Sequence, residues 1–477
     1  MQNPRKCHFF RILGHSRGLL RLAALALVAS AIPALSGSAT AATLSVGPGH
    51  TFATPAEALA RAKAGDTIEV HPRADQQPYE PVALFVSVPR LTFRGVRGKD
   101  GAGPRVALSG KGFEYSGRGR VPRAIIQFLK GADGGRVEGF LLSGAKNTSH
   151  NGAGVRVDKA NDVTIVDCEI RGNEMGIMSN GDGGGELMKN LVIERCEIHR
   201  NGAPEDPGLN HNLYLGGASA HLRFCDVHHS LTGHNVKSRA RRTVVEACWI
   251  HDSANRELDL VDAGDTERPK ADALLLGCVI AKDPKCKGNR GLIHFGQDGG
   301  KDHRGTLHIV NCTIVMPFKS PLVELSAPSA KAVIASCLIS AGPGKERHQT
   351  LIGTRAKGTK AGSTVRRCLL PEAYRKDVEG LDKMDSKAAG AVIFTHKAPS
   401  FRAPKRGDYR VRSAHPALRR GGLPLDELRL PEFPTLPLLK LKGPGPPWQF
   451  SPDKHGAPAG RERKDGKRPD IGACSLK

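Results

Sequence analysis

A short motif, in which cysteine is followed two positions later by an aliphatic residue, recurs eight times between residues 166 and 370. It reads VDCEI, ERCEI, RFCDV, EACWI, LGCVI, VNCTI, ASCLI and RRCLL, and successive cysteines are 23 to 34 residues apart. Alternation along a strand turns each cysteine to the same side as that aliphatic residue. A repeat of this length, varying by several residues, predicts a stack of coils in which short strands are joined by loops of different lengths.

Two consecutive coils in the middle of the chain match residue by residue. Six pairs are separated by 23 positions: His211 and His234, Asn212 and Asn235, Tyr214 and Lys237, Cys225 and Cys248, His228 and His251, Ser230 and Ser253. A spacing this constant places equivalent side chains above one another in neighbouring coils.

These features predict an all-β protein, a single right-handed parallel β-helix. The chain resembles the pectate-lyase-like β-helix proteins that bacteria secrete, from its opening GDTIEV to its closing GDYRVRSAHPALRRGG and PDIGACS. The resemblance implies the fold, whereas one fold hosts many activities.

The ends of the chain differ from the repeats. Residues 1–41 contain five basic residues, an apolar run and the small residues Ala39, Thr40 and Ala41, which together predict a signal peptide and export to the periplasm or the medium. No later apolar stretch is long enough to span a membrane. We expect a monomer.

Three further segments follow the signal peptide. Residues 42–90 are expected to form an N-terminal cap with a helix over 54–64 and the first strands, and residues 91–370 the β-helix. Residues 371–477, rich in Pro and basic residues, predict an irregular tail that packs along the outside of the coils and caps their end. A flexible basic appendage is the alternative.

The charge of the chain favours an anionic partner. Without residues 1–41 the chain has 66 basic and 47 acidic residues, a formal charge of +19. Anionic polysaccharide fits both this charge and the expected compartment. A nucleic-acid partner is not expected, because only 5% of the residues are aromatic and few side chains could stack on bases.

The eight repeat cysteines are expected to be small buried hydrophobic residues. Neighbouring coils lie ~4.8 Å apart, whereas the Cβ atoms of a disulfide lie ~3.8 Å apart. The sequence contains no CxxC pair, so a zinc site is not expected. Cys286 and Cys474 fall outside the repeat.

Alternation also predicts a polar row on one outer face of the coils. If Leu213 and Val236 point inward, their neighbours point outward. The outward candidates are Arg156, Asn212, Tyr214, Asn235, Lys237, Arg239, Glu257, Asp259 and His294. Asn212 and Asn235 also fit a ladder that hydrogen-bonds between coils, and His211 and His234 fit either a structural ladder or a pair in a pocket.

One phrase in this row carries a more specific resemblance. GHNVKSRA is similar to the corresponding region of the alginate lyases and chondroitinase B, which implies that Lys237 is the base that removes the proton α to a uronate carboxylate. The chemistry needs a lysine of lowered pKa, which the neighbouring Arg239, Arg241 and Arg242 are expected to provide.

The chain departs from that group at two places. The position of the group's arginine acid holds Val261, so Arg239 or Arg256 would have to substitute. The acids that hold calcium in the group correspond to Leu231, Thr232 and Gly233, so we expect no required cofactor, and calcium would need other ligands.

Three classes of function are compatible with the row. The first is a polysaccharide lyase acting on a uronate polymer, in which Lys237 is the base, Arg239 and Arg256 neutralise the carboxylate, and Tyr214 or His234 donates the proton; a C5-epimerase would share the proton abstraction. The candidate substrate-binding residues are Asn212, Asn235, His211, His294 and Arg156.

The second class of function is a glycoside hydrolase using Glu257 and Asp259, although this pair could simply balance the charges of Lys237 and Arg239. The third is a non-catalytic glycan-binding protein.

Overall fold

The structure is a computed structural model that describes residues 40–98, 103–180, 187–262, 264, 271–298, 303–341, 349–355, 358–381, 392–396, 401–403, 408–411, 448–452 and 458–462. The chain divides into two units, Met1–Thr40 and Ala41–Lys477. Apart from its last two positions, the predicted signal peptide lies outside the described residues, and the account below concerns the second unit.

Within the described residues, the second unit contains three long parallel sheets, here called A, B and C. Sheet A has twelve strands: β1 (Thr43–Val46), β2 (Thr67–Val70), β4 (Thr92–Gly95), β7 (Arg136–Glu138), β10 (Thr164–Val166), β13 (Leu191–Glu194), β16 (Ser219–Arg223), β19 (Arg242–Glu246), β22 (Asp272–Leu276), β25 (Thr306–Val310), β28 (Lys331–Ala335) and β31 (Thr364–Arg366). Sheet B has eleven: β5 (Val106–Ser109), β8 (Phe140–Ser143), β11 (Glu169–Arg171), β14 (Glu197–His199), β17 (Asp226–His228), β20 (Trp249–His251), β23 (Val279–Ala281), β26 (Thr313–Val315), β29 (Leu338–Ser340), β32 (Leu369–Pro371) and β33 (Ile393–Thr395). Sheet C has ten: β3 (Leu84–Val86), β6 (Ala124–Phe128), β9 (Ala153–Asp158), β12 (Met175–Asn180), β15 (Leu213–Leu215), β18 (Val236–Ser238), β21 (Leu258–Val261), β24 (Ile293–Gly296), β27 (Val323–Leu325) and β30 (Ile352–Thr354).

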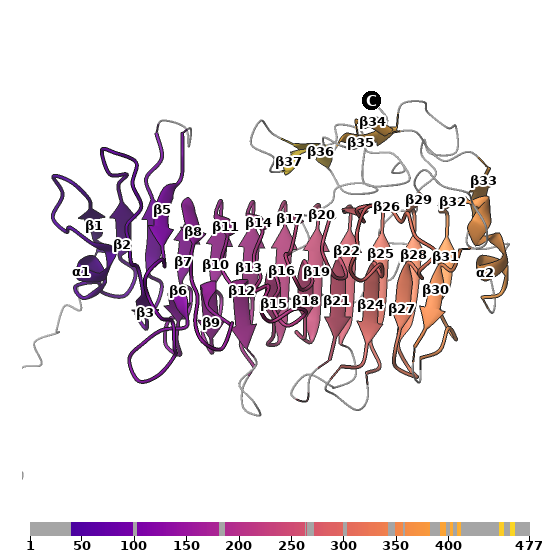
Figure 1. Ribbon diagram of the computed structural model, residues 1–477, viewed down its shortest axis with the longest axis horizontal. Helices are drawn as coiled ribbons and strands as arrows, with labels where there is room; N and C mark the ends of the chain where they lie inside the picture. Colours follow the sequence, from indigo (N-terminus) through magenta and orange to yellow (C-terminus); the bar gives the residue numbers. More distant parts are fainter. Residues whose placement is uncertain are drawn as a thin grey trace, which may run out of the picture. The chain divides into compact units, whose positions relative to one another are not determined.

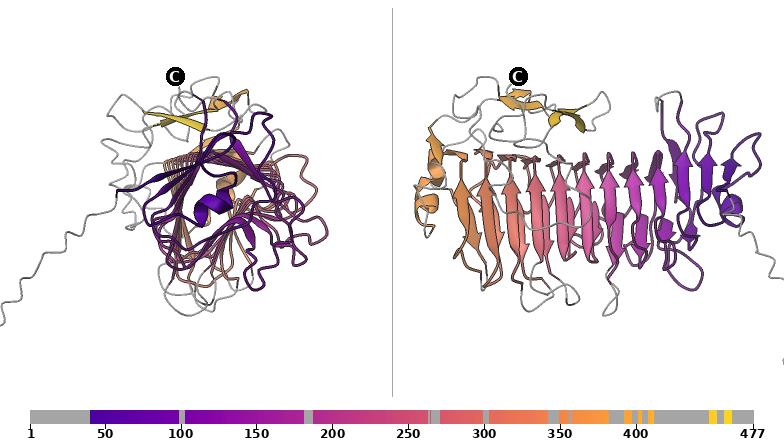
Figure 2. Two further views of the ribbon diagram at one scale, coloured as in Figure 1. Left: turned by 90° about the vertical axis from the view of Figure 1, so that its left-hand side faces the viewer. Right: turned by 180° about the vertical axis from the view of Figure 1, so that it is seen from behind.

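From β4 to β30, each coil contributes one strand to each sheet. The chain passes from β16 in sheet A to β17 in sheet B and β18 in sheet C, and then returns to sheet A as β19, which pairs with β16 in parallel. Figure 1 shows these strands side by side along the stack, and Figure 2 (left) shows the coils in projection around a common interior. Crossovers between parallel strands of one sheet are right-handed. The predicted right-handed parallel β-helix is therefore confirmed.

The repeated cysteine marks the corner between sheets A and B. The residue before each repeat cysteine has a φ between 46° and 63°, in the left-handed region that bends the chain sharply: Asp167, Arg195, Phe224, Ala247, Gly277, Asn311, Ser336 and Arg367. The bend turns the thiol into the interior, where Cys225 Sγ lies 3.4 Å from the carbonyl oxygen of Ile193 in the preceding coil. All eight repeat cysteines are buried and free, which confirms the expectation that they are not disulfides.

Short helices close both ends of the interior. The N-terminal helix α1 (Pro55–Leu59) begins after Thr54, whose hydroxyl accepts a hydrogen bond from the backbone N–H of Glu57. It is shorter than the predicted 54–64, because the N–H groups of Arg61 and Ala62 bond to carbonyls only three residues back and tighten the chain into a turn. At the other end lie the 3₁₀-helix η2 (Glu372–Tyr374) and α2 (Arg375–Glu379). Both helices are too short to cross a membrane, and no longer helix is present among the described residues.

The described parts of the C-terminal segment are not wholly irregular. β34 (Phe401–Ala403) pairs with β35 (Asp408–Val411), and β36 (Trp448–Pro452) pairs with β37 (Pro458–Glu462), both antiparallel. Phe401 packs against buried residues of sheet B. Most of residues 404–477, including the proline-rich run before Trp448, lies outside the described residues.

Candidate functional site

The outer face of sheet C carries a row of side chains at directly paired positions, and all but one of them are polar. Val236 and Leu258 are fully buried in the interior, so the predicted phase of the strands is confirmed. The residues that alternate with such buried positions along the strands form the outer row: Gln127, Arg156, Met178, Tyr214, Lys237, Asp259, His294 and Glu324. We call this the sheet C row.

Asp259 lies close to four basic side chains. Its carboxylate lies 2.7 Å from His294 Nδ1, 3.1 Å from Lys237 Nζ, 3.5 Å from His234 Nε2 and 3.7 Å from an Arg256 nitrogen. Burial alone would raise the pKa of this carboxyl, but the hydrogen bond from His294 and the nearby cations outweigh burial and hold the pKa well below its usual range. Asp259 is therefore a fixed negative charge.

Lys237 bridges Asp259 to a second carboxylate, Asp298. Its Nζ lies 3.0 Å from Asp298, and Asp298 also accepts hydrogen bonds of 3.0 and 2.5 Å from Arg239. Burial alone would lower the pKa of Lys237, but Asp259 and Asp298 outweigh it and raise the pKa above its ordinary value. The expected lowering of this pKa by neighbouring arginines is therefore wrong, because two carboxylates contact the ammonium group directly.

The sequence did not indicate Asp298. It follows β24 by two residues, in a loop where strand alternation no longer predicts the direction of a side chain. Its backbone N–H is held by Asp262 Oδ1 at 2.7 Å. In the sequence, Asp298 is marked only by its position four residues after His294. An acid at such a distance from a histidine is too common to identify a site residue.

His211 and His234 form a stacked pair whose proton positions follow from their hydrogen bonds. Their ring centroids are 5.0 Å apart and nearly parallel. The Nδ1 atom of His211 accepts the backbone N–H of His234, and that of His234 accepts the backbone N–H of Arg256. Burial lowers the pKa of His234 to about 4 and that of His211 well below its ordinary value, so both rings are neutral at pH 7 with the proton on Nε2.

Asn212, Asn235 and Glu257 do not face outward, so these three predicted placements are wrong. They precede their strands, at the corner between sheets B and C, where alternation does not yet apply. All three are fully buried. Amide groups donate at 2.6 to 3.2 Å along a line that runs from Asn173 through Asn201, Asn212 and Asn235 to Glu257, and each of these hydrogen bonds except that from Asn201 to Asn212 joins two coils. The asparagines thus form the inter-coil ladder that was the alternative expectation.

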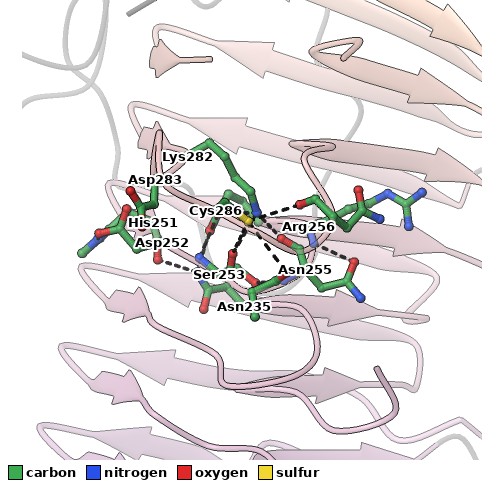
Figure 3. A network of polar contacts seen from close by, with 12 residues as sticks. Asn235, His251, Asp252, Ser253, Asn255, Arg256, Lys282, Asp283 and Cys286 are labelled. Carbon is green, nitrogen blue, oxygen red and sulfur yellow. Dashed lines mark hydrogen bonds and ion pairs between the residues drawn. The ribbon is translucent and has the colours of Figure 1, made fainter. Parts of the chain in front are cut away.

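The ladder ends in a buried ion pair between Glu257 and Lys282. Lys282 Nζ lies 3.2 Å from Glu257 Oε1 and donates to the carbonyl oxygens of Ser253, at 2.9 Å, and Asn255. Figure 3 shows Lys282 extended towards these carbonyls, with the half-buried Cys286 beside it. Because Glu257 is enclosed, it cannot act with Asp259 on a substrate outside the coils, and the hydrolase hypothesis loses its second carboxylate.

The other predicted residues lie at different points along the row. We call Lys237, its partners Asp259 and Asp298, and the arginines that contact these two carboxylates the Lys237 cluster. Arg256 contacts Asp259 and also Glu324, so it belongs to this cluster. Arg239 contacts Asp298 and lies 5.4 Å from the centre of the Tyr214 ring, so it belongs to the cluster as well. Arg156 lies three strands away, where it pairs with Asp158 at 3.1 Å and lines a cavity of about 280 Å³. It shares the face but not the cluster.

Sheet B carries a second polar arrangement, a stack of His199, His228 and His251. Each ring lies 3.2 to 3.4 Å from a carboxylate of the preceding coil. Burial opposes protonation of His251, but hydrogen bonds to Asp226 and Asp252 raise its pKa to about 9. The 23-residue repeat had indicated that His228 and His251 are stacked, but not their acid partners.

Three groups of histidine and carboxylate side chains among the described residues could hold a metal ion, and none includes Asp259 or Asp298. The contacts within the Lys237 cluster are ion pairs between its own side chains.

Comparison with known proteins finds similarity among solved structures. The fold and the site together describe a parallel β-helix protein with a charged row on the outer face of one sheet. No protein-family model and no curated protein matches the chain. A crystal structure of pectate lyase Pel9A is similar, with 14% sequence identity over 92% of this chain and 97% of that one, and a TM-score of 0.47. The fold assignment rests on the strand pairing itself.

The buried pair predicts a large effect of substituting Lys282. Lys282→Met leaves the Glu257 carboxylate without its cation, and we expect unfolding free energy to fall by about 3–5 kcal/mol in chemical denaturation. Adding Glu257→Gln should recover much of this loss. Exposed Lys285 provides the control, and Lys285→Met should change stability by less than about 0.5 kcal/mol. Equal effects of the two lysine substitutions would contradict the ion pair.

The raised pKa of His251 predicts a stability contribution that depends on pH. A histidine whose pKa rises from 6.5 to about 9 on folding stabilises the protein fully below the unfolded value and loses this effect as pH rises through about 9. We expect His251→Gln to cost up to about 3 kcal/mol at acidic pH and progressively less as pH rises through this window. His229→Gln is the control, since burial lowers the pKa of His229 to about 4. A cost for His251→Gln that is constant with pH would refute the assignment.

Proposed function

We propose that the protein is a polysaccharide lyase that cleaves an anionic, uronate-containing polysaccharide by β-elimination on the outer face of sheet C. The observation that carries this proposal is the pairing of Tyr214 and Lys237 at adjacent positions of the sheet C row, with Arg239 beside both. A strand spacing of ~4.8 Å brings an amine and a phenol to one short segment of a chain laid along the row.

The arginines have the charge and position to bind the substrate carboxylate. Arg239 shares the partner Asp298 with Lys237, and Arg256 shares the partner Asp259 with it, so the partners of both arginines are carboxylates. A uronate carboxylate offers the same chemistry as Asp298 or Glu324 and can take its place. Neutralising that carboxylate makes the neighbouring C–H more acidic, which is the main electrostatic requirement of the reaction.

The proton transfers follow from the same geometry. Neutral Lys237 takes the proton α to the carboxylate, the electron pair forms the new carbon–carbon double bond, and the bond to the bridging oxygen breaks. Tyr214 donates the proton to that oxygen, or His234 does so through its Nε2–H. Because Asp259 and Asp298 favour the charged form of Lys237, the reaction should be slow at neutral pH and accelerate as pH rises.

No metal is assigned to the reaction, and the net charge of the chain accords with an anionic polymer. We further propose that the protein is exported to the periplasm or the medium, where such polymers are met.

The proposal is tested by offering alginate, pectate and glycosaminoglycans and measuring the ultraviolet absorbance of unsaturated uronate products. We expect absorbance to rise with one class of polymer and Lys237→Ala to reduce the rate by about 10²–10⁴-fold. Lys285→Ala, an exposed lysine outside the row, is the matched control. Binding without unsaturated product would indicate a glycan-binding protein, and solvent proton exchange without cleavage would indicate an epimerase. Either result would overturn the lyase proposal.

The role of Lys237 as base predicts the effect of Asp298→Asn. Asp298 raises the pKa of Lys237, so its removal lowers that pKa and increases the neutral fraction at any pH below it. We expect the rising limb of kcat/KM against pH to move towards lower pH, with a several-fold faster reaction at fixed pH. If Lys237 only binds the carboxylate as a cation, the limb will stay in place and KM alone will change.

A further inference from the structure

A histidine and two glutamates converge where the chain enters three neighbouring strands of sheet C. His150 precedes β9, Glu174 precedes β12, and Glu205 lies between β14 and β15. The Nδ1 atom of His150 is 3.4 Å from Glu174 Oε1 and 3.5 Å from Glu205 Oε1, and the three atoms lie within 4.8 Å of one another. These residues come from three different coils, so only the fold brings them together.

Glu174 is the buried member of the cluster and is held firmly. It has 3% of its side chain exposed, and its other oxygen, Oε2, accepts the backbone N–H groups of Asn147 and Gly152, each at 2.9 Å. The backbone of His150 is held by its N–H, which donates to the Asn147 carbonyl oxygen at 3.0 Å. The Glu174 carboxylate is therefore fixed in direction before any ligand arrives.

Two buried polar atoms here have no hydrogen-bond partner among the described residues: His150 Nδ1 and Asn210 Oδ1. Asn210 is fully buried and donates its amide Nδ2 to the His150 carbonyl oxygen, which places it against the cluster. A buried polar atom left unsatisfied costs about 1–3 kcal/mol. Acceptor atoms gathered around one point are satisfied together by a cation.

We propose that His150, Glu174 and Glu205 form a binding site for a divalent transition metal of the Zn²⁺ type. Ligand atoms ~2.0–2.2 Å from a tetrahedral zinc lie roughly 3.3–3.6 Å from one another, which matches the separations of His150 Nδ1 from both carboxylates. Asn210, whose amide donates to the His150 backbone and whose Oδ1 has no hydrogen-bond partner among the described residues, is a candidate for a fourth ligand. An imidazole among the donors favours zinc over calcium, which prefers oxygen ligands throughout.

The site is open to solvent on one side, because the side chain of Glu205 is 51% exposed and that of His150 34%. A metal can therefore enter without unfolding the coil. The remaining two groups of possible ligands among the described residues belong to the histidine stack of sheet B. There ring nitrogens of His228 and His251 make hydrogen bonds to carboxylates, at 3.4 and 3.2 Å, whereas His150 Nδ1 makes none among the described residues.

The site is tested by titrating the chelator-treated full chain with ZnCl₂ in a calorimeter, without polysaccharide. We expect one equivalent to bind, and His150→Gln and Glu205→Gln each to weaken binding by at least about tenfold. Glu205 is exposed, so its substitution should not disturb folding, and circular dichroism checks this for both variants. His228→Gln in sheet B is the matched control and should bind zinc as the wild type does. CaCl₂ should bind more weakly than ZnCl₂.

Three results would overturn the proposal: no zinc binding up to about millimolar concentration, unchanged affinity in both site variants, or loss of binding only in His228→Gln. The first would leave the direct contacts of His150 with the two glutamates as the explanation of the cluster. Because binding is measured directly, the outcome is independent of whether the sheet C row cleaves a polysaccharide.

Discussion

Parallel pairing in constant register is the interaction on which the rest of this structure depends. Within each sheet, a residue of one coil lies beside the equivalent residue of the next, at the ~4.8 Å spacing of paired strands. The buried thiols, the internal amide ladder and the outer row of sheet C are all consequences of this one rule. In such a stack each coil contacts only its neighbours, so local substitutions are expected to act locally.

The corners of the coils impose the main cost of this arrangement. Left-handed residues before the cysteines bend the chain from sheet A to sheet B, and at the next corner polar side chains turn into an interior that is otherwise apolar. Buried amides are tolerated because each finds a partner in the adjacent coil. Where the line of asparagines ends, Glu257 accepts a hydrogen bond from the Asn235 amide, and Lys282 neutralises the charge of the Glu257 carboxylate. The polar ladder is thus complete in itself and contributes nothing to the outer surface.

Charge balance governs the outer face of sheet C. Lys237, Arg239 and Arg256 each contact a carboxylate of the protein itself, so any anionic ligand on this face must compete with Asp259, Asp298 and Glu324 for these cations. The basic net charge of the chain gives no indication of this local balance, because it sums over side chains that never meet. An anionic ligand can displace a partly exposed acid such as Asp298 more readily than the buried Asp259.

By itself, the sequence determined the coil architecture, its inner lining and the outward direction of Tyr214, Lys237, Asp259 and His294, because strand alternation and a regular repeat act over short distances. Only the tertiary structure decided that Asn212, Asn235 and Glu257 turn inward, that Lys237 carries a raised pKa, and that Asp298 and Lys282 complete two ion-pair networks. Those outcomes depend on corners and loops, where no periodicity applies, and on contacts between residues 25 to 61 positions apart. Electrostatic energies follow such distances, which a linear pattern does not contain.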